Sequence, residues 1–407
     1  MDISIQKSKL YNHKTVQITG SKSESNRLLL LQALYPQICI ENVSNSDDSV
    51  LMQKALASKE EIIDIHHAGT AMRFLTAYLA IQEGRTFVVT GSARMKERPI
   101  KILVEALKSL GAEISYLEND GFPPLKIIGK TLNKSKVSLE ANVSSQYISA
   151  LLLIASKLEN GLELSLEGTI TSVPYIKMTL SLLNEIGVET RFNGNKILVK
   201  PYHSQLKPQT LTVESDWSSA SYFYSVIALS AIGTEITIAA YKKDSLQGDS
   251  VLADIYKSFG VSTYYNERSI RMVKEKGTQS LHLKFHLSDA PDIAQTIAVT
   301  AFGLGVQCDL TGLHTLKIKE TDRLVALKTE LKKLGAALEI TSESLHLKSA
   351  TIIHSNISID TYKDHRMAMA FAPLGLKTNL LIKDADVVSK SYPQFWEDFK
   401  AIGFNLK

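Results

Sequence analysis

The segment ILVEALKSLG, residues 102–111, sets the pattern on which the predicted fold depends. Apolar residues recur in it at three- and four-residue spacing, as at Leu103, Ala106 and Leu107, which indicates an amphipathic helix. Gly111 suits the left-handed turn that commonly closes a helix. A strand-like stretch follows, so the segment predicts a helix, a glycine turn and a strand in succession.

The same succession recurs along the chain. Further copies are the helices predicted at 178–186, 251–259, 324–334 and 396–402, followed by Gly187, Gly260, Gly335 and Gly403. Successive glycines, from Gly111 on, lie 76, 73, 75 and 68 residues apart, and a weaker copy at 50–57 lacks the glycine. Helix–glycine–strand patterns are common in α/β proteins, but the near-constant spacing favours six related units of roughly 70 residues. We therefore expect an α/β fold of two similar lobes with three units each.

Length and composition agree with two folded domains. The chain has 407 residues, more than one hydrophobic core usually serves. Hydrophobic residues make up 44% and charged residues 22%, which argues against a disordered chain. The net charge of +4 is too small to indicate a nucleic-acid-binding protein by itself, and local basic patches around an anionic substrate would produce it equally well.

Cysteine usage and hydropathy indicate the compartment. Cys39 and Cys308 form no Cys-x-x-Cys pair, so neither a disulfide framework nor a zinc site is expected, and a reducing compartment fits. The start of the chain shows no signal-peptide pattern, and no apolar stretch is long enough to span a membrane. We expect a cytoplasmic protein.

Small and hydroxyl residues precede four predicted apolar helices. These segments are GSKSESNR (20–27), HAGTAMR (67–73), SSQ (144–146) and DWSSAS (216–221). A helix start offers unpaired N–H groups and the positive end of the helix dipole, so added hydroxyl and lysine side chains make a phosphate or carboxylate site. Capping alone is the better explanation at Asp216, whereas three serines with Lys22 and Arg27 exceed what a cap needs. The spacing is not that of a Walker A loop, so nucleotide hydrolysis is not favoured.

Four charged clusters lie at predicted strand-to-helix junctions. They are RMKERP (94–99), KIKETDR (317–323), KDHR (363–366) and SKSYP (389–393). Taken singly, each could be a solvated surface patch. Their shared placement favours ligand binding, because α/β proteins gather ligands at such junctions. Arg and Lys bind phosphate and carboxylate groups, so the clusters suit a substrate with more than one anionic group.

Two acidic residues stand near these cations. Asp292 precedes an apolar helix, where an acid is also common for reasons of the helix dipole alone. A carboxylate that faces several cations stays ionised and can act as a base, and Glu320 is the second candidate acid. His66 and His67 lack a third ligand at suitable spacing, so we expect no metal site there.

Together these segments resemble the 5-enolpyruvylshikimate-3-phosphate synthase family. The matching motifs, in the family's order, are GSKSxSNR (20–27), AGTAMR (68–73), RMKERP (94–99), SSQ (144–146), KETDR (319–323), DHRMAM (364–369) and Lys390. The resemblance implies a monomer of two lobes, each with three βαβαββ units, formed by residues 20–213 and by residues 1–19 with 214–407. It implies an active site in the cleft between lobes that close on the substrates, without a metal or an organic cofactor.

The reaction implied by the resemblance is transfer of the enolpyruvyl group of phosphoenolpyruvate to the 5-hydroxyl of shikimate 3-phosphate. It proceeds by addition and elimination, releases phosphate, and belongs to chorismate and aromatic amino acid biosynthesis. The implied partners are these two small molecules, with neither nucleic acid nor membrane.

The resemblance also assigns site residues. Those implied to hold shikimate 3-phosphate are Lys22, Ser23, Arg27, Ser144, Ser145, Gln146, Ser172, Tyr175, Asp292, Thr315 and Lys319. Those implied to hold phosphoenolpyruvate are Lys22, Gly69, Arg94, Gln146, Arg323, Arg366 and Lys390. Asp292 would take the proton from the 5-hydroxyl, Glu320 would exchange protons at the enol methylene, and Lys22 would be the third catalytic residue.

The chain departs from the family pattern at a few positions. His67 stands where Asn is usual, Phe74 where Pro is common, Thr315 where many members have Asn, and Lys317 where Arg is frequent, which affects affinities more than the reaction.

Two other functions are possible for a chain of this pattern. The UDP-N-acetylglucosamine enolpyruvyl transferase family carries a reactive Cys in the loop that matches GSAR (91–94), and this loop has no Cys. A non-catalytic anion- or RNA-binding scaffold would need exposed aromatics beside its basic residues, and the motifs show no such pattern.

Overall fold

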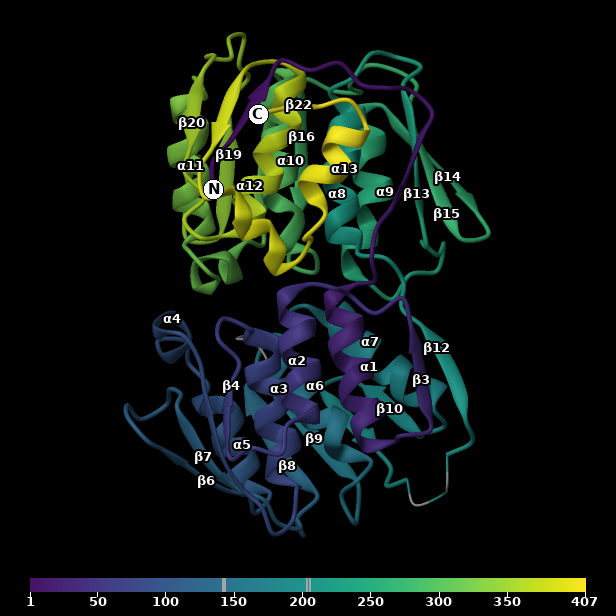
Figure 1. The fold of residues 1–407 in the computed structure, drawn as a ribbon, viewed down its shortest axis with the longest axis vertical. Coiled ribbons are helices and arrows are strands. Elements are labelled where there is room, and N and C mark those ends of the chain that lie inside the picture. Colours follow the sequence, from purple (N-terminus) through teal and green to yellow (C-terminus); the bar gives the residue numbers. More distant parts are fainter. Residues whose placement is uncertain (141–143, 203, 205) are drawn as a thin grey trace. The chain divides into compact units, whose positions relative to one another are not determined.

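The chain forms two compact units in the computed structural model, which describes residues 1–140, 144–202, 204 and 206–407. Unit 1 comprises Met1–Thr19 with Glu214–Lys407, and unit 2 comprises Gly20–Val213. Both are built from repeats in which strands alternate with helices, as the ribbon in Figure 1 shows. The α/β class predicted from the repeated glycines is therefore confirmed.

Two repeats of unit 2 have the full βαβαββ pattern. The elements of the first are β4 (Ile62–Asp64), α3 (Gly69–Ala80), β5 (Thr86–Thr90), α4 (Ala93–Lys96), α5 (Lys101–Ser109), β6 (Glu113–Tyr116) and β7 (Leu125–Ile128). Those of the second are β8 (Lys136–Glu140), α6 (Ser145–Ala155), β9 (Leu162–Glu167), α7 (Val173–Glu185), β10 (Thr190–Asn193) and β11 (Lys196–Val199). In each sheet the first two strands are parallel and the closing hairpin is antiparallel, which gives the orders β4-β5-β7-β6 and β8-β9-β11-β10.

The remaining repeat of unit 2 is shorter. Its elements are α1 (Lys22–Leu34), β3 (Ile38–Glu41), α2 (Asp47–Ala57) and β12 (Gln209–Thr212), and β12 pairs with β3 in a parallel two-stranded sheet. After α2 the chain leaves in an extended conformation at Ser58 instead of turning back through a glycine. The weaker sequence copy at 50–57 lacks its glycine because no hairpin of this sheet follows it.

Unit 1 has three four-stranded sheets of the same design in the part of the chain that the structure describes. The first repeat contains β2 (Lys14–Gln17), α8 (Trp217–Ala228), β13 (Glu235–Ala239), the 3-10 helix η1 (Gly248–Val251), α9 (Leu252–Ile255), η2 (Tyr256–Phe259), β14 (Val261–Asn266) and β15 (Ser269–Lys274). The second contains β16 (His282–His286), η3 (Pro291–Ile293), α10 (Ala294–Leu304), β17 (Gln307–Thr311), η4 (His314–Ile318), α11 (Arg323–Lys333), β18 (Leu338–Ile340) and β19 (Ser344–Leu347). The third contains β20 (Ile357–Ile359), α12 (His365–Phe371), η5 (Ala372–Leu376), β21 (Leu380–Ile382), η6 (Ala385–Lys390), α13 (Phe395–Ala401), β22 (Asn405–Leu406) and β1 (Ile3–Gln6).

The first two strands of the chain complete sheets of unit 1. β2 lies parallel to β13 at the edge of the sheet β2-β13-β15-β14, and β1 lies between β21 and β22, antiparallel to both. The start of the chain is thus tied to the sequence that follows Val213.

The five predicted helix-closing glycines all adopt the left-handed conformation. The φ angles are 108° at Gly111, 91° at Gly187, 80° at Gly260, 101° at Gly335 and 114° at Gly403. The prediction of one continuous helix at 251–259 was wrong, because this segment is divided among η1, α9 and η2. Its β-branched and aromatic residues form helices weakly, so its path follows the packing of the fully buried Leu252, Tyr256 and Phe259.

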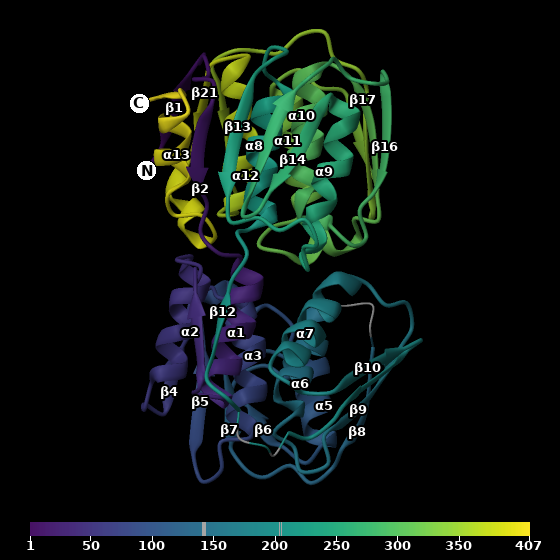
Figure 2. The same cartoon turned by 90° about the vertical axis from the view of Figure 1, so that its right-hand side faces the viewer.

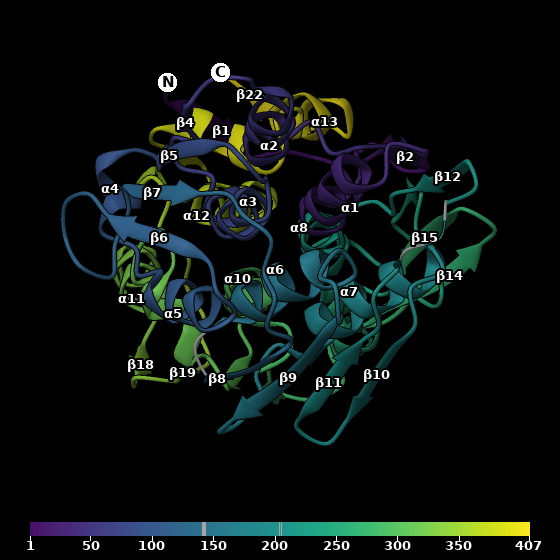
Figure 3. The same ribbon diagram turned by 90° about the horizontal axis from the view of Figure 1, so that it is seen from below.

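The helix that follows the first strand of each repeat lies in the core. All residues of α8 are buried, and α3, α6 and α12 are buried on almost every side. Figure 2 shows β13 and β14 beside α8 and α9, and Figure 3, which looks along α1 and α3, shows β9–β11 outside them. The helix starts carry the motifs singled out in the sequence, so burial of these helices fixes the positions of the candidate site residues.

Candidate active site

Lys22 and Asp48 lie together at the starts of two helices of unit 2. Lys22 is the first residue of α1, and its Nζ lies 3.3 Å from Oδ2 of Asp48 in the first turn of α2. The side chain of the N-cap residue Ser21 makes no capping hydrogen bond to the start of α1. The phosphate or carboxylate site expected at residues 20–27 stays a prediction.

The starts of α3 and α6 are linked by side chains. Nε2 of Gln146 donates a hydrogen bond of 3.3 Å to Oγ1 of Thr70, and Ser144 caps α6 by accepting from the backbone N–H of Gln146. A Cβ at Gly69 would lie 2.3 Å from NH1 of Arg98, so only glycine allows this guanidinium to approach the helix start. The structure therefore brings Gly69, Gln146 and Arg98 into one region of unit 2.

Arg27 is held inside unit 2 by a full set of acceptors. Its Nε donates to Oγ1 of Thr179 at 2.8 Å, NH2 donates to Oγ of Ser149 at 2.9 Å, and NH1 donates to the carbonyl of Ser23 at 2.7 Å. The side chain is 2% exposed, and burial lowers the pKa of its guanidinium to about 10. The contacts of Arg27 fix the backbone of Ser23, next to Lys22, in place.

Three further predicted residues of unit 2 lie on the same elements or near them. Ser172 precedes α7 with a φ of 55°, and the ring of Tyr175 in α7 lies 5.9 Å from Cζ of Arg27. Phe74 is one of the departures from the family pattern. The centre of its ring lies 5.4 Å from Cζ of Arg27. Arg94 lies on the short helix α4, where it pairs with Glu97 at 2.8 Å and is more than half exposed.

Arg323 is the centre of a charged cluster in unit 1. It is 2% exposed, and its Nε lies 2.7 Å from Oδ2 of Asp364, which is fully buried. Its NH1 lies 3.0 Å from Oδ1 of Asp292, and its NH2 lies 2.8 Å from Oε2 of Glu320. Three carboxylates from η3, from the segment before α11 and from the start of α12 therefore meet at one guanidinium.

Further cations complete the cluster around the two candidate acids. Oδ2 of Asp292 accepts a hydrogen bond of 2.9 Å from NH2 of Arg366, and Nζ of Lys319 lies 3.4 Å from Oδ1. Nζ of Lys390 lies 3.1 Å from Oε1 of Glu320. We call this set the unit 1 cluster; its members are Asp292, Lys319, Glu320, Arg323, Asp364, Arg366 and Lys390.

The unit 1 cluster has the electrostatics of an anion site with a base. Burial alone would raise the pKa of the Asp292 carboxyl, but Arg366, Lys319 and Arg323 outweigh burial and hold that pKa well below its usual range. Asp292 is thus ionised and able to accept a proton. With four cations and three carboxylates, the cluster has a surplus of positive charge, and its cations can exchange carboxylate partners for the anionic groups of a ligand.

Unit 1 also contains Thr315 and the Asp216 segment, which the sequence analysis singled out. Thr315 lies in η4, is buried, and its hydroxyl has no hydrogen-bond partner among the described residues. Asp216 caps α8 by accepting from the N–H of Ser219, as predicted. Ser218 does more than the sequence suggested, because its Oγ accepts a hydrogen bond of 3.3 Å from NH2 of Arg366.

Sequence reasoning missed partners of the predicted residues. Asp48 and Asp364 both pair with a predicted cation, but each stands in the first turn or cap of a helix, where acids are common without any site. The one signal was the position of Asp364 inside the KDHR segment. Asp249, which bonds Ser218, gave no signal at all.

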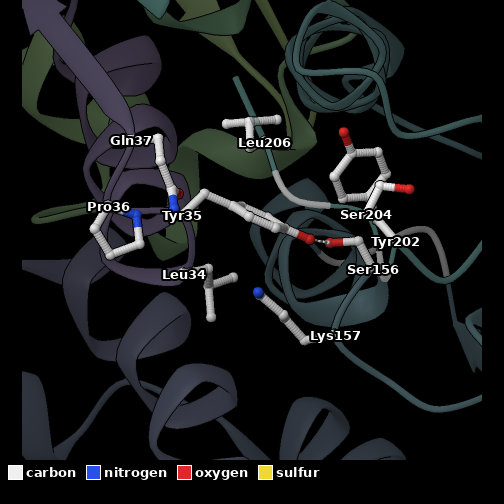
Figure 4. Close-up of a pocket in the computed structure, with 9 residues that line it drawn as sticks. All are labelled: Leu34, Tyr35, Pro36, Gln37, Ser156, Lys157, Tyr202, Ser204 and Leu206. Carbon is white, nitrogen blue, oxygen red and sulfur yellow. Dashed lines mark hydrogen bonds between the residues drawn. The ribbon is translucent and has the colours of Figure 1, made fainter. Parts of the chain in front are cut away.

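A separate cavity of about 360 Å³ lies at the C-terminal ends of α1 and α6, as Figure 4 shows. Its lining comprises Leu34, Tyr35, Pro36, Gln37, Ser156, Lys157, Tyr202, Ser204 and Leu206. The hydroxyl of Tyr35 donates to Oγ of Ser156 at 2.9 Å, and Nζ of Lys157 lies 3.9 Å from the ring centre of Tyr35. Because α1 spans about 20 Å at 1.5 Å per residue, this cavity does not belong to the region of Lys22.

Neither metal binding nor a membrane span is indicated by the described residues. Within them, no three His, Cys, Asp or Glu side chains are grouped so as to hold a metal ion. Nor does the described part of the chain contain a helix that is both long and apolar enough to cross a bilayer.

Comparisons with known proteins identify the family of this chain. The family model for EPSP synthase (3-phosphoshikimate 1-carboxyvinyltransferase) matches residues 52–399. A 3-phosphoshikimate 1-carboxyvinyltransferase of Bacteroides fragilis (strain YCH46) is 47% identical over 398 residues, covering 97% of this chain and 96% of the relative. One from Haemophilus influenzae (strain PittEE) is 35% identical over 421 residues, covering 95% and 96%.

Solved structures share the fold. An EPSP synthase from Acinetobacter baumannii matches with a TM-score of 0.80 and 22% identity, covering 100% of this chain and 99% of its own. The enolpyruvyl transferase NikO from Streptomyces tendae matches with a TM-score of 0.76 and 12% identity, covering 100% and 98%. The fold is thus that of the enolpyruvyl transferases.

The sequence matches narrow this class to one family. The chain belongs to the EPSP synthase (3-phosphoshikimate 1-carboxyvinyltransferase) family, and it is accordingly an enzyme of the transferase class. The resemblance drawn from the sequence motifs is confirmed.

Proposed function

We propose that this chain transfers the enolpyruvyl group of phosphoenolpyruvate to the 5-hydroxyl of shikimate 3-phosphate and releases phosphate. The observation that carries this proposal is the unit 1 cluster, in which the ionised Asp292 stands among Arg323, Arg366 and Lys319. Membership of the family and the printed names of the relatives support it. The chain would then act in the shikimate pathway, as a cytoplasmic monomer.

The cations hold the two substrates by their anionic groups. Phosphoenolpyruvate is assigned to Lys22, Gly69, Arg94, Gln146, Arg323, Arg366 and Lys390. Shikimate 3-phosphate is assigned to Lys22, Ser23, Arg27, Ser144, Ser145, Gln146, Ser172, Tyr175, Asp292, Thr315 and Lys319. Arg366 and Arg323 suit a carboxylate or phosphate because a guanidinium donates in a fork, and the positive end of the α1 dipole beside Lys22 suits a phosphate.

Arg27 acts chiefly through its neighbours in this scheme. Its donors are engaged by Ser23, Ser149 and Thr179, so it supports the backbone beside Lys22. We propose that the two units act together on one pair of substrates. Fixing both reactants then removes much of the entropic barrier to their reaction, and exclusion of water protects the intermediate.

Asp292 takes the proton from the 5-hydroxyl as the hydroxyl oxygen attacks C2 of phosphoenolpyruvate. The surrounding cations keep Asp292 ionised before the reaction, so it is in the form that accepts a proton. Glu320, held between Arg323 and Lys390, exchanges the proton at C3: the methylene gains a proton during addition and loses it during elimination. The C2–O bond to phosphate breaks in the second step, and the double bond re-forms. Lys22, whose ammonium group donates hydrogen bonds, stabilises the charge on the leaving phosphate.

Phosphate release with two alternative acceptors tests the function. We expect the purified protein to release phosphate from phosphoenolpyruvate with shikimate 3-phosphate and not with UDP-N-acetylglucosamine, the acceptor of the other enolpyruvyl transferase reaction considered. Asp292→Asn should lower kcat about a hundredfold or more, because a positioned acid–base group contributes at least that much. Asp254→Asn is a matched control, since Asp254 pairs with Lys257 on the surface. Release with UDP-N-acetylglucosamine alone, or unchanged turnover in Asp292→Asn, would overturn the proposal.

A further inference from the structure

Asp249 is a buried acid next to the unit 1 cluster that has no role in the proposed reaction. It lies in η1 with a side chain that is 2% exposed. Its Oδ2 accepts a hydrogen bond from Oγ of Ser218, and its Oδ1 has no hydrogen-bond partner among the described residues. A buried carboxylate with an unpaired oxygen is costly, so its retention calls for a physical reason.

A short path of hydrogen bonds joins Asp249 to the cluster. NH2 of Arg366 donates both to Oγ of Ser218 at 3.3 Å and to Oδ2 of Asp292 at 2.9 Å. Ser218 in turn donates to Asp249. One nitrogen of Arg366 is therefore shared between the candidate base and a serine whose orientation depends on Asp249, while Nε of Arg366 has no partner among the described residues.

Burial and the neighbouring charges together raise the pKa of the Asp249 carboxyl. Burial raises the pKa of the Asp249 carboxyl to about 7, and the negative charge of Asp292 adds to the effect, against the opposing charge of Arg366. Among the described residues, the groups that act on Asp249 are Asp216 at the N-cap of α8, Ser218 in α8, Asp292 in η3 and Arg366 in α12. The acid of α9, Asp254, is exposed and paired with Lys257. Asp249 therefore changes its protonation near neutral pH, whereas Asp292 stays ionised.

The direction of the hydrogen bonds follows this proton. Ionised Asp249 accepts from Ser218, whose oxygen then accepts from Arg366 and draws the guanidinium toward η1. Protonated Asp249 donates to Ser218 instead and removes one negative charge from the neighbourhood of Arg366. A bound anion on Arg366 is thus opposed by ionised Asp249 and favoured by the protonated form.

We propose that Asp249 is a positioning residue that acts through Ser218 on Arg366, and that its proton sets how strongly Arg366 binds the anionic donor substrate. The inference rests on the proposed assignment of Arg366 to phosphoenolpyruvate. Anion binding at Arg366 and protonation of Asp249 are coupled, so affinity for phosphoenolpyruvate falls as the pH rises through neutrality.

The test compares KM for phosphoenolpyruvate in the wild type and Asp249→Asn from about pH 6 to about pH 8.5, either side of the Asp249 transition. Asn keeps the shape of the side chain and is always neutral, and comparison at each pH cancels the titration of the substrate itself. The ratio of wild-type KM to variant KM should be near unity at the acid end. It should rise to about tenfold at the alkaline end, because ionised Asp249 repels the anion bound by Arg366 at an effective dielectric near 20. The kcat values should agree within about twofold, as expected of a residue outside the chemical step.

Each outcome decides the proposal. A pH-independent ratio, or a loss of kcat with unchanged KM, overturns it; Asp254→Asn should follow the wild type at every pH. Should Asp249→Asn fail to fold by circular dichroism, Asp249→Ser removes the same charge and carries the comparison. If the wild type releases no phosphate with shikimate 3-phosphate, the proposed function fails separately. The coupling is then tested by calorimetry of inorganic phosphate binding to the same variants, where a pH-independent ratio of the two affinities overturns it.

Discussion

The substitution Asp364→Asn isolates the electrostatic contribution of the carboxylate that holds Arg323. Asp364 is fully buried, lies 2.7 Å from Nε of Arg323, and caps α12 by accepting from the N–H of Arg366 at 2.9 Å. Asn caps a helix about as well as Asp, so the variant keeps the cap and loses the charge. Arg323 is 2% exposed and cannot turn to solvent for compensation.

The expected loss of stability follows from the burial of both partners. Removing one partner of a buried ion pair costs about 3–5 kcal/mol, and Arg323 retains Asp292 and Glu320, so we expect about 3 kcal/mol. In a unit of this size 1 kcal/mol lowers Tm by about 2–4 °C, so the transition of unit 1 should fall by about 6–12 °C.

Differential scanning calorimetry at about pH 7 measures this shift. Asp254→Asn is the control, because its ion pair with Lys257 is exposed and contributes less than about 1 kcal/mol. A fall in Tm for Asp364→Asn no larger than that of the control would refute the reasoning that buried charge compensation stabilises the cluster.

Three further predictions concern single side chains. Lys22→Ala should lower kcat about a hundredfold or more in the phosphate release assay, and near-normal turnover would remove Lys22 from the chemical step. Burial, with Lys377 nearby, lowers the pKa of Lys274 to about 8 from an unfolded value of 10.5, so the unfolded chain binds the extra proton between these values. Stability should therefore rise with pH across that window in urea titrations, and Lys274→Met should abolish the rise; an unchanged slope would contradict this. Burial alone would raise the pKa of Asp309, but hydrogen bonds from His346 and His282 outweigh it and lower that pKa below 3.8. The stability that Asp309 contributes should be lost as the pH falls below about 4. In the same urea titrations, the free energy of unfolding of Asp309→Asn should therefore fall less steeply with decreasing pH than that of the wild type. An equally steep fall would rule out this contribution.

The repeat architecture was predictable from sequence because each repeat needs the same backbone turn. A helix that turns directly into a hairpin strand requires a positive φ, which glycine adopts readily, so Gly111, Gly187 and their counterparts mark the repeats. The exception at 50–57 follows the same rule, since the chain continues in extended form at Ser58. The pairing of β12 with β3 was not predictable from periodicity, because hydrophobic spacing does not specify which distant strand completes a sheet.

The candidate site was predictable where residues occur in motifs and not where they act through tertiary contacts. Lys319, Glu320 and Arg323 stand within one segment, and the structure brings them to Asp292. Asp249 occurs alone in a Gln-Gly-Asp-Ser stretch that also suits a turn, so nothing in the local sequence separates it from a surface acid. Burial of the Arg27 donors likewise depends on Ser149 and Thr179, which come from other helices.

The identity of the product formed from carbon-13-labelled phosphoenolpyruvate tests the central claim most directly. With shikimate 3-phosphate as acceptor, NMR should show the labelled enolpyruvyl carbon joined through an ether to C5 of the acceptor, with one phosphate released for each molecule formed. Labelled pyruvate in place of the ether, or an ether at another hydroxyl, would contradict the account.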